Sequence, residues 1–95
     1  MTGTRADFGL LRGLCAAIDR SPDADLLLIA TGTHLSPSHG ETLSEITDAG
    51  FTPAATVPIW TGHDDSVSTA RDTGAAIGAF ASVLDELAPD VVVVL

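Results

Sequence analysis

The part of the chain that decides the fold is a short apolar run passing into a glycine turn, Leu26-Leu27-Leu28-Ile29-Ala30-Thr31-Gly32-Thr33. Residues 26–30 are apolar throughout, with no alternation of apolar and polar side chains. A strand that is covered on both faces shows this pattern, and such strands are typical of parallel sheets with helices on both sides. The Thr-Gly-Thr that follows is expected at the carboxyl end of the strand, where open parallel sheets bind their ligands.

Helices and strands are predicted on both sides of this run. Apolar side chains recur every three or four residues in two segments, and another segment opens with a proline and closes at a glycine. Two further short stretches are apolar enough for strands. The predicted order is helix 8–20, strand 26–30, helix from about 36 to 50, strand 54–59, helix 66–87 and strand 91–95. This alternation indicates the α/β class, as a partial Rossmann-like parallel sheet with flanking helices.

Local signals predict where these elements begin and end. Asp7 is the predicted N-cap of the first helix, and Asp65 stands at the start of the long one. Ser36-Pro37 offers an N-cap followed by a proline at the first helical position, and Gly50 is a natural stop. Pro58 lacks an amide hydrogen, so its strand is expected to be short or at an edge. The spacing places one face of the first helix at Phe8, Leu11, Leu14, Cys15 and Ile18. In the long helix the apolar and small positions that recur every three or four residues are Val67, Ala70, Gly74, Ile77, Ala81 and Leu84.

Both ends of the chain differ from a complete domain of this class. Thr2-Gly3-Thr4 has the form of a loop that leaves a strand and enters a helix, yet only Met1 precedes it. The last residues, 91–95, form an apolar run with no loop or polar residue after it. Such a strand leaves backbone groups and valine side chains uncovered unless more protein packs on it. We therefore expect both ends to be cuts, and residues 1–95 to be an incomplete domain.

The composition describes a small, acidic chain. Its 95 residues include 13 Asp and Glu against four Arg and no Lys, which gives a formal net charge of -9. This field repels phosphate, so a nucleic-acid-binding role is excluded. A Lys-free, Asp-rich surface is typical of a salt-rich cytoplasm, and an Ala- and Asp-rich mesophilic protein is the alternative. A single cysteine and no apolar run near 20 residues predict a cytoplasmic protein without a membrane span.

Chemistry is expected at the two loops that share Thr-Gly-Thr, residues 2–4 and 31–33. Glycine lets the backbone approach a ligand closely, and the amide groups of the helix start beside Arg5 can hold a phosphate group. A solvated surface arginine is the alternative for Arg5. The first loop is not a P-loop, which needs Gly-Lys-Ser/Thr, and not the dinucleotide fingerprint, since Gly3 and Gly9 are six residues apart. It is predicted to be a generic phosphate loop.

The histidines and the single cysteine carry less information. His34, His39 and His63 lack the spacing of a metal motif, and no metal site is predicted. His34 follows the predicted strand end, where an imidazole either bonds a substrate or transfers a proton, or else only fixes its own loop. Both alternatives stay open. Cys15 is predicted to be a small core residue, and Trp60 a packing or interface residue.

Several motifs follow one another along the chain: Thr2–Leu11, then Thr31–Pro37 with Gly40 and Thr42, then Glu45-Ile46 with Gly50-Phe51, then Leu87–Leu95. Together they cover essentially the whole chain, and their order and spacing resemble the N-terminal part of the UDP-N-acetylglucosamine 2-epimerases. Arg5-Ala6-Asp7 and His34-Leu35-Ser36-Pro37 are similar to the hydrolysing branch, because the non-hydrolysing branch usually has Pro-Glu after the arginine.

The resemblance implies two Rossmann-like halves in a GT-B-like fold, with the nucleotide sugar in the cleft between them. It implies conversion of UDP-N-acetylglucosamine and water to N-acetylmannosamine and UDP, through elimination of UDP to a glycal and addition of water, for sialic-acid-type sugar synthesis. UDP-N-acetylglucosamine or UDP is then the partner, no cofactor is needed, and the whole protein commonly forms dimers through its N-terminal half.

The same resemblance assigns roles to individual residues. Arg5 would contact the UDP phosphates, the loop from Gly3 to Gly9 would shape that pocket, and His34 would lie at the sugar end of the cleft. Asp7 would be either a helix cap or a polar group near the sugar. The predicted binding residues are Gly3, Thr4, Arg5, Asp7, Gly9 and His34.

Compared with the family, this chain lacks a first strand, the Gly-Asp motif after the last strand, the groups used for proton transfer and the second half of the cleft. No catalytic residue is predicted in residues 1–95, and this chain alone should not turn over substrate. A fragment of a hydrolysing epimerase is the leading hypothesis. The alternatives are a stand-alone nucleotide-binding or oligomerisation module that pairs through its long helix, and a remnant of a truncated gene.

Overall fold

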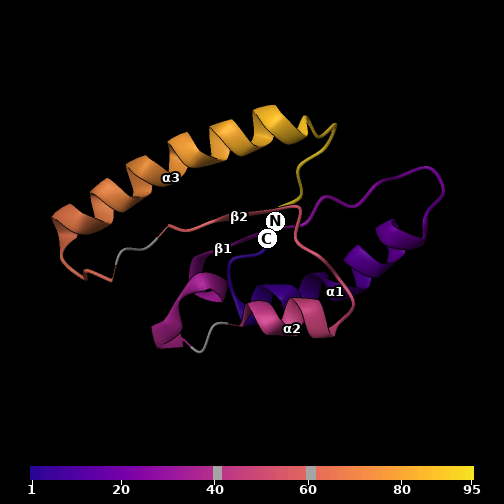
Figure 1. The fold of residues 1–95 in the computed structure, drawn as a ribbon, viewed down its shortest axis with the longest axis horizontal. Helices are drawn as coiled ribbons and strands as arrows, with labels where there is room; N and C mark the ends of the chain where they lie inside the picture. Colours follow the sequence, from indigo (N-terminus) through magenta and orange to yellow (C-terminus); the bar gives the residue numbers. More distant parts are fainter. Residues whose placement is uncertain (40–41, 60–61) are drawn as a thin grey trace.

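The computed structural model describes residues 1–39, 42–59 and 62–95. Figure 1 shows three layers, with one long helix on one face of a small sheet and two helices on the other face. The elements follow in the order α1 (Arg5–Arg20), β1 (Ile29–Thr31), 3₁₀ turns at Gly32–Leu35 and Pro37–His39, α2 (Leu43–Asp48), β2 (Ala55–Val57) and α3 (Ser66–Leu87). The predicted α/β class is confirmed, as a partial Rossmann-like arrangement.

The sheet is parallel and centred on β1. Every residue of β1 is buried, as predicted for a strand covered on both faces, although the strand begins later than the predicted 26–30. Thr2 forms a parallel bridge to Ala30 on the edge of β1 that β2 leaves free. Within the described residues β2 has β1 as its strand partner, in agreement with the edge position expected from Pro58. The register pairs Ile29 with Ala55, Ala30 with Thr56 and Thr31 with Val57.

The predicted strand at 91–95 is not formed as such. Within the described part of the chain they form no strand, and the Met1 amino group donates to the Val93 carbonyl oxygen at 3.0 Å. Thr2 turns both its amide and its carbonyl toward β1. Successive residues of an extended chain turn these groups to opposite sides. Residues 91–95 therefore lie on the side of Thr2 that faces away from β1.

The first helix begins earlier than expected. Thr4, not Asp7, is the N-cap of α1, so the helix starts at Arg5 and not near Phe8. Phe8 and Cys15 are buried on its inward face as predicted, whereas Leu14 is 44% exposed and lies off that face. The prediction of a helix through Arg20 is otherwise confirmed.

The second helix is much shorter than predicted. Residues 32–39 form two 3₁₀ turns, and α2 begins only at Leu43. Pro37 starts a 3₁₀ turn here, since Ser36 donates its amide to the Thr33 carbonyl and closes the preceding turn. Gly50 follows the helix with a φ of 91°, in agreement with its predicted role as a stop.

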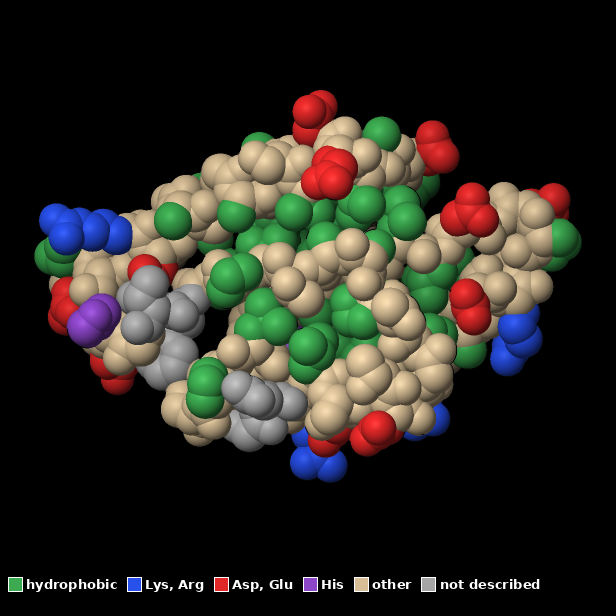
Figure 2. Space-filling model, viewed as in Figure 1, with side chains coloured by type: hydrophobic (Ala, Val, Ile, Leu, Met, Phe, Trp, Pro, Cys, Tyr) green, Lys and Arg blue, Asp and Glu red, His purple; other side chains and the backbone are tan. Residues whose placement is uncertain are grey.

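The core lies between α1, α2 and β1. Its buried members are Phe8, Leu11, Cys15, Leu28, Ala30 and Ile46. Figure 2 shows a second band of hydrophobic side chains between α3 and the middle of the molecule. Among the described residues no helix combines the length and the apolar character that a bilayer crossing requires.

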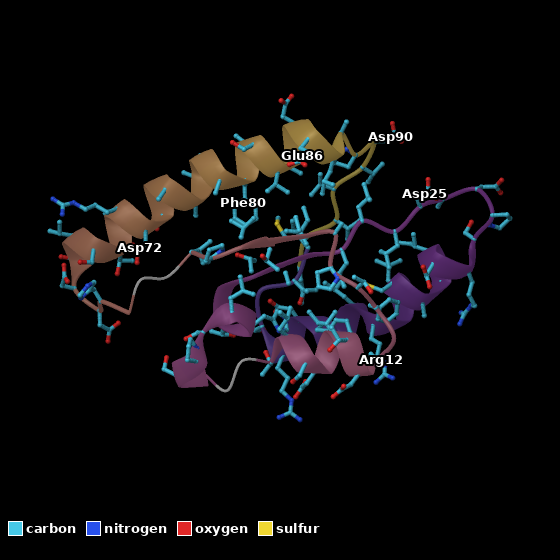
Figure 3. All side chains as sticks on the ribbon, in the orientation of Figure 1. Arg12, Asp25, Asp72, Phe80, Glu86 and Asp90 are labelled. Atoms are coloured by element: carbon cyan, nitrogen blue, oxygen red, sulfur yellow. The ribbon has the colours of Figure 1, made fainter. Side chains whose placement is uncertain are left out.

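The long helix covers the opposite face less completely. The predicted bounds of α3 are confirmed, and Asp65 caps it by accepting from the Ser68 amide at 2.9 Å. Phe80 points from α3 toward the sheet, whereas Arg12 points from α1 away from it (Figure 3). Ala76 is the buried residue of α3, whereas Ile77, one of the apolar positions that recur at helical spacing, is 67% exposed. Trp60 lies outside the described residues.

Candidate functional site

The two Thr-Gly-Thr loops lie side by side. The Thr33 amide and hydroxyl both donate to the Gly3 carbonyl oxygen, at 2.8 and 3.2 Å. The Thr2 amide donates to the Ile29 carbonyl at 2.9 Å, and the Thr31 amide donates to the Thr2 carbonyl at 3.0 Å. Both loops therefore leave neighbouring parallel segments at the same edge, the carboxyl edge, where the sequence placed them.

Gly32 makes this contact between the loops feasible. Its φ is 59°, a left-handed value that side chains other than glycine rarely adopt. A Cβ on Gly32 would lie 2.5 Å from the Gly3 carbonyl oxygen, well inside van der Waals contact. The prediction assigned the loop glycines to close approach of a ligand. At Gly32 the close approach is to the backbone of the other loop.

Asp7 fastens the first loop to α1. The Thr4 hydroxyl accepts from the Asp7 amide at 3.1 Å, and the Asp7 carboxylate accepts from the Gly3 amide at 3.3 Å. These two bonds bind donors that the start of a helix would otherwise leave unpaired. Of the two roles considered for Asp7, the structure shows a contribution to the helix start. It acts from inside the first turn, with Thr4 as the cap.

Arg5 occupies the first turn of α1 with an exposed side chain. Its Nε donates to Glu45 Oε1 on α2 at 2.9 Å, and the two side chains are 75% and 37% exposed. Ion pairs this exposed contribute about 0–1 kcal/mol. Arg5 and Gly9 also line a pocket of about 350 Å³ between α1 and α2, which Arg12 and Asp48 border as well. The Arg5 guanidinium, which is predicted to bind phosphate, is thus exposed to solvent and only weakly bound by Glu45.

His34 is fully buried, with 0% of its surface exposed. Its Nε2 lies 3.0 Å from the Thr2 hydroxyl, and its Nδ1 lies 2.7 Å from the Thr42 hydroxyl. The Phe8 ring meets the imidazole edge to face at a centroid distance of 6.4 Å. The geometry supports the second of the two alternatives for His34, in which the imidazole fixes its loop. A contact with the sugar stays a prediction.

The six predicted binding residues are divided among three places. Gly3, Thr4 and Asp7 form the loop and cap, Arg5 and Gly9 face the pocket between α1 and α2, and His34 lies beneath the loops. Residues outside the six predicted binding residues complete the arrangement, namely Thr2, Gly32, Thr33, Thr42 and Glu45. The spacing of Thr42 and Glu45 is that of a capping box, which could have drawn attention to both.

Two groups near this core have shifted pKa values, the Cys15 thiol and the Met1 amino group. Burial raises the pKa of the Cys15 thiol, and burial lowers the pKa of the Met1 amino group. A thiol of this kind stays protonated and unreactive near neutral pH. Cys15 is therefore a packing residue, as the helix periodicity predicted.

Comparison with known proteins shows the family to which the chain is similar. The sequence model of the family described as UDP-N-acetylglucosamine 2-epimerase matches residues 16–95. The GDP/UDP-N,N'-diacetylbacillosamine 2-epimerase (hydrolyzing) of Campylobacter jejuni is 40% identical over the whole chain. The UDP-N,N'-diacetylbacillosamine 2-epimerase (hydrolyzing) of Legionella pneumophila is 35% identical over the whole chain. The UDP-N-acetylglucosamine 2-epimerase of Neisseria meningitidis is 33% identical over 99% of the chain.

The chain spans about a quarter of the length of these relatives, 24%, 25% and 24% respectively. The match is to their N-terminal quarter. Because the family model covers most of the residues and the parallel fold agrees with it, the chain belongs to the UDP-N-acetylglucosamine 2-epimerase family.

Proposed function

We propose that the chain supplies the phosphate-facing part of the nucleotide-sugar site in a hydrolysing 2-epimerase. The reaction is the conversion of UDP-N-acetylglucosamine and water to N-acetylmannosamine and UDP. The observation that carries the proposal is the pair of adjacent loops at the carboxyl edge of the sheet, with Arg5 in the first turn of the helix that follows. A helix start and an arginine together favour a phosphate group, even in a chain of net charge -9.

The hydrolysing outcome is supported by the relatives. The two relatives that are 40% and 35% identical both carry "hydrolyzing" in their names. Both are also named for UDP-N,N'-diacetylbacillosamine, a sugar with two acetamido groups. This favours a second candidate substrate of the same class, a UDP-linked diacetamido sugar, beside UDP-N-acetylglucosamine. Both candidates share the UDP that we assign to Arg5 and its loop.

We propose further that this chain is inactive alone. Elimination of UDP and proton transfer at the sugar each need a positioned acid or base. The described carboxylates nearest the loops, Asp7 and Glu45, are already engaged with the Gly3 amide and with Arg5. The groups that move protons would then come from the remaining length that the relatives have. Cytoplasmic location and assembly into homo-oligomers also stay proposals.

Calorimetry with UDP on the intact protein that carries this chain tests the assignment. Replacing Arg5→Ala removes a charged hydrogen-bond donor, and we expect UDP affinity to fall about 10- to 100-fold. Arg20→Ala is the matched control, because Arg20 is exposed at the far end of α1, about 22 Å away along the helix axis. It removes the same charge beyond the reach of unscreened attraction.

The expected pattern is a large loss of affinity for Arg5→Ala and a change of less than about two-fold for Arg20→Ala. Equal UDP affinities in the two variants, or no UDP binding by the unchanged protein, would refute the assignment of UDP to Arg5 and its loop. Release of UDP from the two candidate sugars, measured side by side in the intact protein, then decides between the substrates.

A further inference from the structure

His34 connects two parts of the site that are far apart in sequence. On one side it bonds Thr2, where the chain enters the first loop, and on the other it bonds Thr42, directly before α2. We propose that His34 is a positioning residue that places Arg5 through α2, and that it is not a proton carrier. The inference rests on the proposed function, because it concerns how the protein holds UDP.

Burial protects the bond between His34 and Thr2. His34 is 0% exposed and Thr2 is 1% exposed, so water cannot replace Thr2 in this bond, whereas Thr42 is half-buried. A buried polar group that loses its partner costs about 1–3 kcal/mol. A threonine hydroxyl both donates and accepts, so two threonines satisfy a neutral imidazole in either tautomer. The edge contact with Phe8 further restricts the ring.

The position of α2 depends on contacts of this kind. The helix has six residues, far fewer than an isolated helix needs for stability in water. Ile46 anchors one side of it in the core with 0% exposure. At its start, Thr42 does not use its hydroxyl to cap the helix, and that hydroxyl meets His34 instead. The His34–Thr42 bond is therefore a polar attachment of the α2 start.

One helical turn after Thr42, α2 presents Glu45 to Arg5. The ion pair joins Arg5 Nε to Glu45 Oε1 at 2.9 Å. Guanidinium has five N–H donors, and this contact uses one of them. Among the residues that the structure describes, no partner holds the two terminal NH₂ groups, which can bind the paired oxygens of a phosphate. A side chain that is held in place before binding loses less rotamer entropy when the ligand arrives. His34 thus acts on Arg5 through Thr42 and Glu45.

A proton-transfer role conflicts with the same geometry. A general acid or base must come within hydrogen-bond reach of the reacting atom, directly or through one water. Both ring nitrogens of His34 are occupied by threonines, and the ring has no exposed surface. Contact of a ring nitrogen with a sugar would require breaking one of these two bonds, of which the bond to Thr2 is buried.

The test uses the intact protein with UDP as the probe in calorimetry, and UDP release to measure kcat and KM. Thr42→Val keeps the shape of the side chain and removes the hydroxyl. Thr73→Val is the matched control, since it removes a hydroxyl bonded to the Thr69 carbonyl on the exposed side of α3. His34→Gln is a second variant, and thermal unfolding checks that all variants fold.

We expect Thr42→Val to weaken UDP binding on the order of five-fold, as for one lost hydrogen bond, with kcat changed less than about two-fold. Thr42→Ser should restore the affinity, and Thr73→Val should leave it unchanged. In an Arg5→Ala background, Thr42→Val should have no further effect on UDP affinity, because the connection from His34 through Thr42 and Glu45 acts on Arg5.

Three outcomes overturn the inference. A loss of kcat in His34→Gln of 100-fold or more, with UDP affinity unchanged, would identify a proton carrier. Equal UDP affinities for Thr42→Val and Thr73→Val, in a protein whose UDP affinity still falls with Arg5→Ala, would refute the connection from His34 to Arg5. The proposed function would not be affected. If Arg5→Ala itself has no effect, the proposed function fails and this inference fails with it.

Discussion

Replacing Gly32→Ala tests the contact between the two loops. The substitution adds a single methyl group at a position where φ is 59° and where Cβ would lie 2.5 Å from the Gly3 carbonyl oxygen. That oxygen cannot simply move away, because the Thr33 amide and hydroxyl both bind it. The methyl group must therefore separate the loops or distort the turn.

The expected cost has two parts. A left-handed conformation costs an alanine about 1–2 kcal/mol relative to glycine. Separating the loops enough to relieve the contact weakens at least one hydrogen bond to Gly3, which adds about 1–2 kcal/mol. We therefore expect the free energy of unfolding to fall by about 2–4 kcal/mol, a large part of the ~5–15 kcal/mol typical of a folded domain. UDP affinity should fall as well, since Arg5 follows the displaced loop.

Equilibrium urea unfolding followed by far-UV circular dichroism measures this loss. Gly50→Ala is the matched control, because Gly50 also has a positive φ, 91°, but a Cβ there would meet nothing within 4 Å. It should lose only the conformational part, about 1–2 kcal/mol. Equal losses in the two variants would show that the close approach of the loops contributes nothing, and the reasoning on Gly32 would be wrong.

Three further predictions concern charge and burial. The pKa of Asp65 lies below its ordinary value of 3.8 because the Ser68 amide and hydroxyl donate to the carboxylate. The stability that this cap adds to α3 is therefore fully present above pH 3.8 and is lost as the pH falls through the lower pKa of the folded protein. Asp65→Ala should remove this acid-dependent loss of helix, measured by circular dichroism. Burial raises the pKa of the Cys15 thiol, so iodoacetamide should label Cys15 slowly at pH 7 and quickly in urea, and fast labelling of the folded protein would contradict its core position. A net charge of -9 should make the melting temperature rise between about 0.1 and 1 M KCl as the screening length shortens from about 10 to 3 Å, and a flat or falling melting temperature would count against adaptation to salt.

The elements with strong local signals could be predicted from the sequence. The uninterrupted apolar run into Thr31 indicated a buried parallel strand, and the spacing of Phe8 and Cys15 indicated a helix that packs on it. The helix expected from Ser36 failed because local preference competed with a distant contact. Pro37 suits a helix start, but burial of His34 between Thr2 and Thr42 holds this segment in 3₁₀ turns.

Apolar periodicity predicts which face of an element is hydrophobic, but it does not identify what covers that face. Val67 and Ile77 follow the helical spacing, yet they are 59% and 67% exposed. Residues 91–95 have the composition of a buried strand, yet their exposed fractions run from 41% to 76%.

The candidate site was predictable in part for a related reason. Arg5 and the Thr-Gly-Thr repeat could be singled out because each has a local chemical meaning, a cation and a flexible turn. Thr42 and Glu45 could not be tied to Arg5 in this way. Their role depends on α2 lying beside α1, and no short-range pattern encodes that placement.

The order of the extended segments predicts which loop would meet a ligand. Across the molecule the spatial order is β2, β1, Thr2 and then residues 91–95. Along the sequence, β1 and β2 follow Thr2 and lie on one side of it, and residues 91–95 come last and lie on its other side. The helices follow the same change, since α1 and α2 lie on one face and α3 on the other (Figure 1). In open parallel sheets, ligands bind where the order reverses, because the loops there separate to opposite faces and leave a crevice. That point is the carboxyl end of the Thr2 segment. We therefore expect the loop leading into Arg5 to face such a crevice, and the loop with His34, which follows β1 on the next segment, to support it from the side.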